Sequence, residues 1–179
     1  MNRNVTIIGV VGLAGSGKNT VAEMLRQAGE TVTTISFAAR LKWVAKHEFG
    51  WDGKKDARGR KLLQEVGEAA RKYSPLHWVR CLEGDYTVYR AASQSLFVVT
   101  DVRFKNEAKW IREHGGVIWR VERDGAGLKG ELGKDASETE QASIKADLVL
   151  QNNADLHSFG DEVVLAYRDL VGGKLEVEV

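Results

Sequence analysis

Residues 5–20, VTIIGVVGLAGSGKNT, decide the fold that this sequence predicts. The first seven residues are mostly β-branched and apolar, which is typical of a strand buried on both faces. Gly12, Gly15 and Gly17 follow, and Lys18 comes directly after the last glycine. A strand, a GxxxxGK loop and a helix in this order form the Walker A pattern.

This loop predicts a phosphate-binding site. Its glycines let successive backbone N–H groups point into one small volume, and the next helix adds the positive end of its dipole there. Lys18 supplies a cation that can follow negative charge between the β- and γ-phosphates of a nucleotide. A glycine-rich turn without a ligand is the alternative, and the agreement of strand, spacing and lysine argues against it.

One position departs from the usual motif. Ser or Thr normally follows the lysine and binds Mg²⁺ through its hydroxyl group, whereas this chain has Asn19. An amide oxygen can bind Mg²⁺ directly or through water, and the sequence leaves both possibilities open. Thr20 comes next, and we expect it to reach a phosphate oxygen from the first turn of the helix.

Composition narrows the class of protein. The chain has 179 residues, 43% of them hydrophobic, which suits one domain with a sizeable core. A net charge of +1, with the charges well mixed, argues against a nucleic-acid partner. The single cysteine, Cys81, excludes an internal disulfide and fits a reducing compartment. With no signal peptide and no apolar run of membrane-spanning length, we expect a cytoplasmic protein that binds no membrane.

Other common catalytic patterns are missing from the sequence. The four histidines show no metal-ligand spacing, and the chain contains no HExxH and no GxSxG. Metalloprotease and serine hydrolase functions are therefore not expected.

Strands and helices alternate along the chain. Strands are expected at residues 5–11, 31–36, 96–100, 117–121 and 148–150. Helices are expected from residue 18 to Gly29, at 37–49, at 60–73, from Pro75 onward, at 104–114 and from Asp155 to about 170. This order predicts a three-layer α/β/α protein, with a mostly parallel sheet covered on both faces and ligands at the carboxyl ends of its strands.

Helical spacing also predicts which side chains face inward. It places Phe49 on the buried face of the helix at 37–49 and Tyr73 on that of the helix at 60–73. Ser74 and Pro75 form a suitable cap and first residue for the helix that follows.

A second polar group follows the strand at 96–100. Asp101 stands where a buried strand meets solvent, as a Walker B acid does, and can hold Mg²⁺ or a water bound to it. Arg103, Asn106 and Glu107 follow in the first turns of a helix. A helix N-terminus with an acidic cap and an exposed ion pair is the structural alternative. The Walker A loop in the same sheet favours a functional site.

Side chains on the intervening helices are further candidates. Lys42 and Arg60 could clamp a second phosphate, because arginine suits bidentate phosphate contacts. Arg71 ranks below them, since arginines on helix surfaces are mostly solvated. Trp78 could stack on a base or fill the core.

A long glycine-rich and charged segment at residues 125–143 follows the fourth strand. Loops of this length in a compact domain are usually functional or disordered. Arg120 and Arg123 precede it and could close on phosphates when it folds over. A lid of this kind would keep water away from the reacting phosphates.

Several segments together resemble phage-type deoxynucleoside monophosphate kinases. In chain order they are GLAGSGKNT, SFAARLK, RKLLQEVGEAARKYSPLHWV, VVTDVRFKNE, ASETE and ADLVLQN. The resemblance runs from about residue 5 to about residue 156, and the GK[DN]T loop of this family makes Asn19 a match. It implies a single P-loop NTPase domain over residues 1–179, like a nucleoside monophosphate kinase, with a five-stranded sheet. An acceptor-binding region would lie at about 37–85 and a lid at about 123–143.

The implied reaction transfers the γ-phosphoryl group of ATP to a dNMP and gives dNDP and ADP. Matching positions imply that the ATP phosphates and magnesium are held by Gly15, Ser16, Gly17, Lys18, Asn19 and Thr20. Asn152 would lie near the adenine, and Asn19 and Asp101 would serve as metal ligands. The acceptor site would be lined by Lys42, Arg60, Gly67, Trp78, Asp101, Arg103 and Glu107.

The same resemblance implies that Lys18, Asp101, Arg103 and Arg123 act in catalysis, with Arg123 neutralising the transferred phosphoryl group. Family members often carry a histidine just before the A-S-E segment, where this chain has Asp135. No role is carried over to that position.

Two alternatives remain at this stage. One is another small P-loop kinase, similar to dephospho-coenzyme A kinase, and the other is a nucleotide-binding module without catalysis. The sequence does not predict which bases or sugars are accepted, or whether the protein is a monomer or a homodimer.

Overall fold

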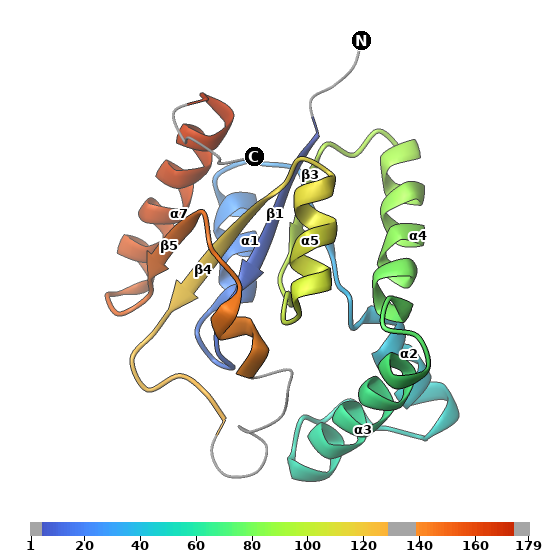
Figure 1. Ribbon diagram of the computed structural model, residues 1–179. Coiled ribbons are helices and arrows are strands. Elements are labelled where there is room, and N and C mark those ends of the chain that lie inside the picture. The colour runs from blue at the N-terminus through green and yellow to red at the C-terminus, as the bar shows by residue number, and fades with distance from the viewer. Residues whose placement is uncertain (1–4, 129–138, 174–179) are drawn as a thin grey trace.

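A five-stranded parallel sheet forms the centre of the protein (Figure 1). The computed structural model describes residues 5–128 and 139–173. The strands are β1 (Thr6–Val11), β2 (Val32–Ile35), β3 (Leu96–Val99), β4 (Val117–Glu122) and β5 (Leu148–Gln151). Their order across the sheet is β2-β3-β1-β4-β5, and every neighbouring pair is parallel. The predicted α/β fold with a five-stranded sheet is confirmed.

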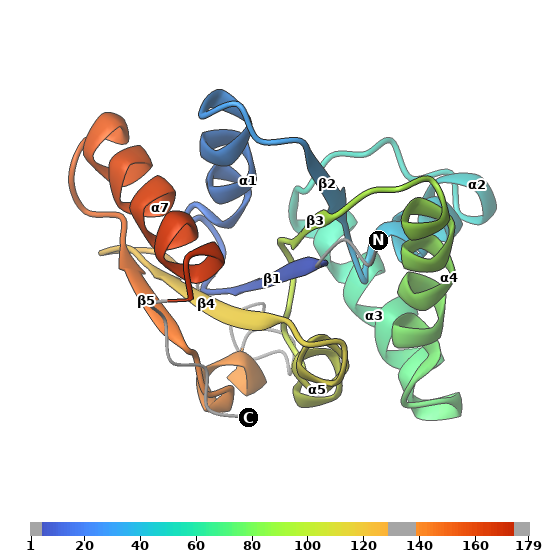
Figure 2. The same cartoon turned by 90° about the horizontal axis from the view of Figure 1, so that it is seen from above.

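Helices cover both faces of this sheet. Seen from above, α1 (Lys18–Gln27) and α7 (Leu156–Val171) lie on one face, and α5 (Lys105–Glu113) lies on the other (Figure 2). The core on the α5 side also takes in α4 (His77–Ala91). Two further helices, α2 (Ala39–Glu48) and α3 (Ala57–Tyr73), lie beyond the carboxyl ends of the strands (Figure 1).

The central strand separates two hydrophobic cores. Ile7 and Val11 of β1 belong to the core under α4 and α5, whereas Ile8 and Val10 belong to the core under α1 and α7. Because side chains of a strand alternate between the faces of the sheet, both sets must be apolar. This explains why β1 is a continuous apolar run in the sequence.

The order of the strands determines where a ligand can bind. The chain runs from β1 to β2 on one side of the sheet, and from β3 it crosses to β4 on the other side. Connections that leave neighbouring strands in opposite directions open a crevice at their carboxyl ends. In this sheet the crevice lies after β1 and β3, where the P-loop and Asp101 stand.

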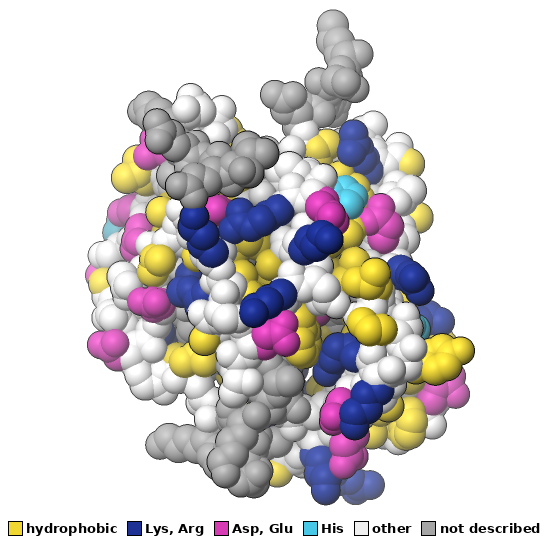
Figure 3. Space-filling model, in the orientation of Figure 1, with side chains coloured by type: hydrophobic (Ala, Val, Ile, Leu, Met, Phe, Trp, Pro, Cys, Tyr) yellow, Lys and Arg dark blue, Asp and Glu magenta, His cyan; other side chains and the backbone are white. Residues whose placement is uncertain are grey.

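The surface around this frame carries mixed charge. Figure 3 shows acidic and basic side chains interspersed over the face that carries α5. No helix in residues 5–128 and 139–173 combines the length and the hydrophobicity needed to span a membrane.

Two helices begin at other residues than those predicted. Asp56 caps α3 by accepting a hydrogen bond from Gly59 N at 2.8 Å, so this helix starts before Arg60. Pro75 lies in a turn closed by the bond from His77 N to Ser74 O, and α4 starts only at His77.

The prediction that Phe49 and Tyr73 face inward was wrong, because 58% of Phe49 and 94% of Tyr73 is exposed. Phe49 is the C-cap of α2 and Tyr73 is the last residue of α3. Periodicity places a residue on a face of its helix, but it does not show where the packing partner of that face ends.

Gly9, in the middle of β1, offers a test of this packing. A methyl group there would collide with the side chains of Ile111 and Ile118, the latter at 2.9 Å. We expect Gly9→Ala to lower the free energy of unfolding by about 1–3 kcal/mol, measured by urea titration.

Gly84, exposed on α4, serves as the matched control, because an added methyl group there meets no atom within 4 Å. Gly84→Ala is expected to raise the free energy of unfolding by about 0.5–1 kcal/mol. Equal effects of the two substitutions would contradict this description of the core.

Candidate active site

A cavity of about 650 Å³ opens at the carboxyl ends of β1, β2 and β3. The P-loop forms one side of it, through Gly15, Gly17, Lys18, Asn19 and Thr20. The opposite side comes from α2, the loop after it, α3, α4, the segment after β3 and the start of α5. Its side chains include Lys42, Lys55, Arg60, Gln64, Arg71, Trp78, Asp101, Arg103 and Glu107. Residues from distant parts of the sequence therefore line one continuous space.

The side chain of Lys18 binds the backbone of its own P-loop. Lys18 Nζ donates hydrogen bonds to the carbonyl oxygens of Gly12, at 2.5 Å, and Leu13, at 2.8 Å. Gly17 has a φ of 106°, and a side chain there would collide with the Asn152 side chain. The glycine is needed both for its left-handed backbone and for this close approach.

Asn152 binds the P-loop through its side chain. Its Nδ2 donates to Ser16 O at 2.7 Å, and its backbone N donates to Glu122 O at 2.8 Å. The side chain is buried and does not line the cavity. Ser16 is also buried, and its hydroxyl has no hydrogen-bond partner within the described part of the chain. The position of Asn152 near an adenine stays a prediction.

Asp101 joins the end of β3 to the turn that leads into α2. Its carboxylate accepts hydrogen bonds from Ser36 Oγ at 2.6 Å, Phe37 N at 3.1 Å and Ala38 N at 3.0 Å. Ala38 is the N-cap of α2, so the negative charge also lies at the positive end of that helix. Both carboxylate oxygens therefore accept hydrogen bonds within the protein.

Glu107 is a buried carboxyl group in the first turn of α5. Its Oε2 accepts from Arg103 N at 2.7 Å and Phe104 N at 3.1 Å. Burial and, after it, the neighbouring Asp101 charge raise the pKa of Glu107 from 4.5 to about 8, against the opposing effect of those two backbone bonds and of the Arg71 charge. At neutral pH the group is therefore mostly protonated.

The cations that line the cavity opposite the P-loop come from different elements. Lys42 lies on α2, Arg60 on α3 and Arg103 after β3. Arg71 lies with its guanidinium 4.3 Å from the centre of the Phe104 ring. Sequence reasoning missed Lys55, which precedes the cap of α3 in a polar stretch with no helical or strand periodicity.

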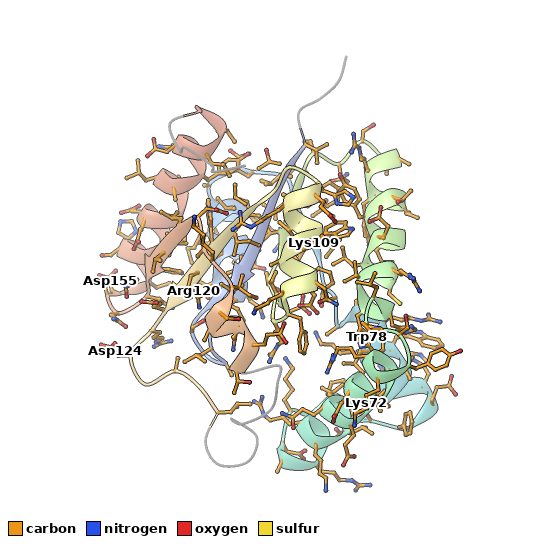
Figure 4. All side chains as sticks on the ribbon, viewed as in Figure 1. Lys72, Trp78, Lys109, Arg120, Asp124 and Asp155 are labelled. Carbon is orange, nitrogen blue, oxygen red and sulfur yellow. The ribbon has the colours of Figure 1, made fainter. Side chains whose placement is uncertain are left out.

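Trp78 makes a hydrogen bond between two helices and also lines the cavity. The residue is buried where α4 begins, next to α3, and its Nε1 donates to Gly67 O at 3.2 Å (Figure 4). Gly67 is buried beneath it and does not line the cavity. Trp78 therefore joins the two helices and presents part of its surface to the cavity.

The two arginines that precede the predicted lid lie apart from the cavity lining. Arg120 Nη2 donates to Gln141 O at 3.1 Å and Ile144 O at 2.6 Å, which holds the short helix η2 (Glu140–Ser143) against β4 (Figure 4). In this arrangement the guanidinium of Arg120 binds these two carbonyl groups, and a role of Arg120 in closing on phosphates stays a prediction. Arg123 is exposed.

Part of the lid segment is described and part is not. Gly127 N donates to Ala14 O at 2.9 Å, and Leu128 lines the cavity, so this end of the segment runs beside the P-loop. Asp135 and most of the ASETE segment lie outside the described residues.

Solved structures of low sequence identity share this fold. Dephospho-CoA kinase from Campylobacter jejuni has a TM-score of 0.56 at 15% identity, with 94% of this chain and 98% of that chain covered. The protein TT1252 from Thermus thermophilus has a TM-score of 0.59 at 19% identity, with 97% and 100% covered. With the Walker A loop at the cavity, the fold is that of the small P-loop kinases.

Sequence comparison identifies the family. A family model described as deoxynucleotide monophosphate kinase matches residues 51–163. A protein of Acanthamoeba polyphaga mimivirus, for which the same activity is proposed, is 30% identical, with 89% of this chain and 95% of that protein covered. The chain belongs to the deoxynucleotide monophosphate kinase family. It is a phosphotransferase, and its kinase activity implies ATP as a substrate.

The family match decides between the alternatives left open by the sequence, which were a kinase similar to dephospho-coenzyme A kinase and a nucleotide-binding module without catalysis. The likeness to dephospho-CoA kinase lies at 15% identity and concerns the fold alone. The name of the matching family gives a deoxynucleotide as the molecule acted on. It also describes an enzyme, in contrast to a nucleotide-binding module without catalysis.

Glu107 makes the stability of this site depend on pH. The pKa of Glu107 is higher in the folded protein than in the unfolded chain, so the folded state holds a proton that the unfolded chain releases above about pH 4.5. This group therefore stabilises the fold at low pH, and its contribution falls by roughly 3 kcal/mol between pH 5 and pH 8. Glu107→Gln is expected to remove that part of the slope in urea unfolding.

The matched control for this experiment is Glu113→Gln. Glu113 lies on the same helix, exposed and 3.6 Å from Lys109 Nζ. Its variant should follow the pH dependence of the unsubstituted protein. If the Glu107→Gln curve ran parallel to that of the unsubstituted protein, the raised pKa would be wrong.

Proposed function

We propose that the cavity holds both nucleotides at once, with their phosphates face to face. The P-loop side would bind the phosphates of ATP, and the side formed by α2, α3 and the segment after β3 would bind the phosphate of the dNMP. The observation that carries this proposal is that Lys18, Asp101 and Arg103 line the same cavity. Phosphoryl transfer requires mainly such alignment, together with neutralisation of negative charge.

On the donor side, the backbone of Gly15 and Gly17 and the start of α1 would cradle the phosphates. Lys18 now binds two neutral carbonyl groups of its own loop. A polyphosphate is a stronger partner for an ammonium group than a carbonyl oxygen, because the bond is then between opposite charges. We expect Lys18 to turn from these carbonyl groups to the ATP phosphates.

On the acceptor side, Lys42, Arg60 and Arg103 would bind the phosphate of the dNMP, with Trp78 beside its base. Asp101 would act mainly by holding the β2–α2 turn, and with it α2 and Lys42, in place. An oxygen of the acceptor phosphate then attacks the γ-phosphorus of ATP. The bond from that phosphorus to the bridging oxygen breaks, and ADP leaves with its negative charge neutralised by the surrounding cations.

The oxygen-bearing side chains at the cavity fit a magnesium ion. Asn19, Thr20 and Asp101 line it, and in the described ranges the chain forms no cluster of three or more His, Cys, Asp or Glu residues. Such a sparse set suits Mg²⁺, which keeps several waters and binds chiefly to substrate phosphates. We propose that Asn19 holds the ion and that Asp101 does so through water. When bound, Mg²⁺ would neutralise part of the negative charge of the phosphates.

The lid remains part of this proposal. The bond from Gly127 N to Ala14 O supports a segment that crosses the donor side, since it fixes one end of the lid to the P-loop. Arg123 stands four residues earlier and would have to move with the lid to reach the transferred phosphoryl group.

Arg103→Ala tests the assignment of the two sides. Loss of a charge-assisted phosphate contact should raise the KM for the dNMP by about 10- to 100-fold and leave the KM for ATP within about twofold. The measurement is a coupled assay of ADP formation with ATP and each of the common dNMPs and NMPs.

Arg58→Ala is the matched control, because Arg58 is exposed on α3 and does not line the cavity. It should leave both KM values unchanged. A rise in the KM for ATP alone would show that Arg103 belongs to the donor side, and the proposed arrangement would fail.

A further inference from the structure

The loop between α2 and α3 is held in one shape by its own side chains. Trp51 N donates to Ala45 O at 3.0 Å, and Trp51 Nε1 donates to Lys54 O at 2.8 Å. Lys54 N donates to Asp52 Oδ1 at 2.9 Å. Gly59 lets the first turn of α3 approach so closely that a side chain there would collide with the carbonyl group of Lys54.

In this loop the neighbouring side chains of Lys54 and Lys55 lie in different surroundings. Lys54 points to solvent, with 77% of its side chain exposed and its Nζ 3.2 Å from Asp52 Oδ2. Lys55 is also exposed, but unlike Lys54 it lines the cavity. Two residues of the same type, adjacent in sequence, therefore differ in whether they face the substrates.

The surroundings of Lys55 are strongly positive. Partial burial lowers the pKa of Lys55, and the charges of Lys42, Arg103 and Arg60 lower it further, against the opposing effect of Asp101. These groups come from four different segments of the chain. Their charges act on one another within the acceptor half of the cavity.

The lining of the cavity has more basic than acidic side chains. Among the described residues, the basic ones are Lys18, Lys42, Lys55, Arg60, Arg71 and Arg103. The acidic ones are Asp101 and Glu107. The cations of the lining therefore outnumber its carboxyl groups. Like charges held this close repel one another, and a multiply charged anion relieves that repulsion.

We propose that Lys55 is a ligand of the acceptor phosphate, supplied by the rigid α2–α3 loop. This inference rests on the proposed function, in which the Lys42, Arg60 and Arg103 side of the cavity holds the dNMP. Lys55 adds a charge that a nucleoside without a phosphate cannot use. It thereby helps the enzyme to select a nucleotide monophosphate over the corresponding nucleoside.

Chemical labelling of the native protein tests this contact directly. The protein is treated briefly with an amine-acetylating reagent, alone, with ATP, or with the dNMP that gives the highest turnover, and the labelled lysines are quantified by mass spectrometry. The dNMP should slow acetylation of Lys55 by about fivefold or more, whereas ATP alone should not. Acetylation of Lys54 should change with neither nucleotide.

Kinetics of two variants give the second measurement. Lys55→Met should raise the KM for the dNMP by about tenfold or more, with little change in the KM for ATP, and Lys55→Arg should restore most of the loss. Lys54→Met, the matched control, should behave as the unsubstituted enzyme.

The outcomes separate this inference from the function on which it rests. If Arg103→Ala raises the KM for the dNMP while Lys55→Met does not, and the dNMP leaves Lys55 unprotected, the role of Lys55 is wrong and the acceptor side stands. If both variants raise only the KM for ATP, the acceptor side itself is misplaced, and the inference falls with it.

Discussion

The arrangement of the site depends on the three hydrogen bonds that Asp101 accepts from Ser36, Phe37 and Ala38. Asp101 follows β3, next to the strand that carries the P-loop, while its three partners form the turn that leads into α2. Hydrogen bonds to an ionised carboxylate are stronger than those between neutral groups, and this one also lies at a helix N-terminus. One carboxylate thereby fixes the acceptor-side helices relative to the phosphate loop. The distance between two bound nucleotides would follow from this connection.

Excess positive charge is the second physical feature of the site. Asn152 and Gly127 each donate a hydrogen bond to the P-loop. The ammonium group of Lys18 is bound by carbonyl groups of the loop itself. On the other side of the cavity, partial burial lowers the pKa of Lys55, and the charges of Lys42, Arg103 and Arg60 lower it further. A site built in this way is incomplete without anions. Binding of two phosphate-bearing substrates would supply the missing negative charge, and the same cations could then neutralise the transferred group.

Much of the fold could be predicted because its signals are local. The β-branched run of β1, the glycines after it and the position of Asp101 at a strand end each follow from neighbouring residues. The hydrogen bond from Asn152 to the P-loop and the protonation of Glu107 could not be predicted in the same way. Asn152 bonds to a residue far away in sequence, and the protonation of Glu107 depends on burial that only the packed structure creates. The sequence around Lys55 does not indicate a binding residue. The hydrogen bonds of Trp51 and Asp52 with Lys54 determine the shape of the loop, and this shape decides whether Lys54 or Lys55 faces the cavity.

The central claim is that one cavity brings two nucleotide phosphates face to face. Binding of a compound in which adenosine and a deoxynucleoside are joined through five phosphates tests it most directly, measured by calorimetry and by competition in the kinase assay. The account predicts a Kd at least about 100-fold lower than that of ATP, because the second half binds as part of the same molecule, and competition with both substrates. An affinity no better than that of ATP, with competition against ATP alone, would contradict it.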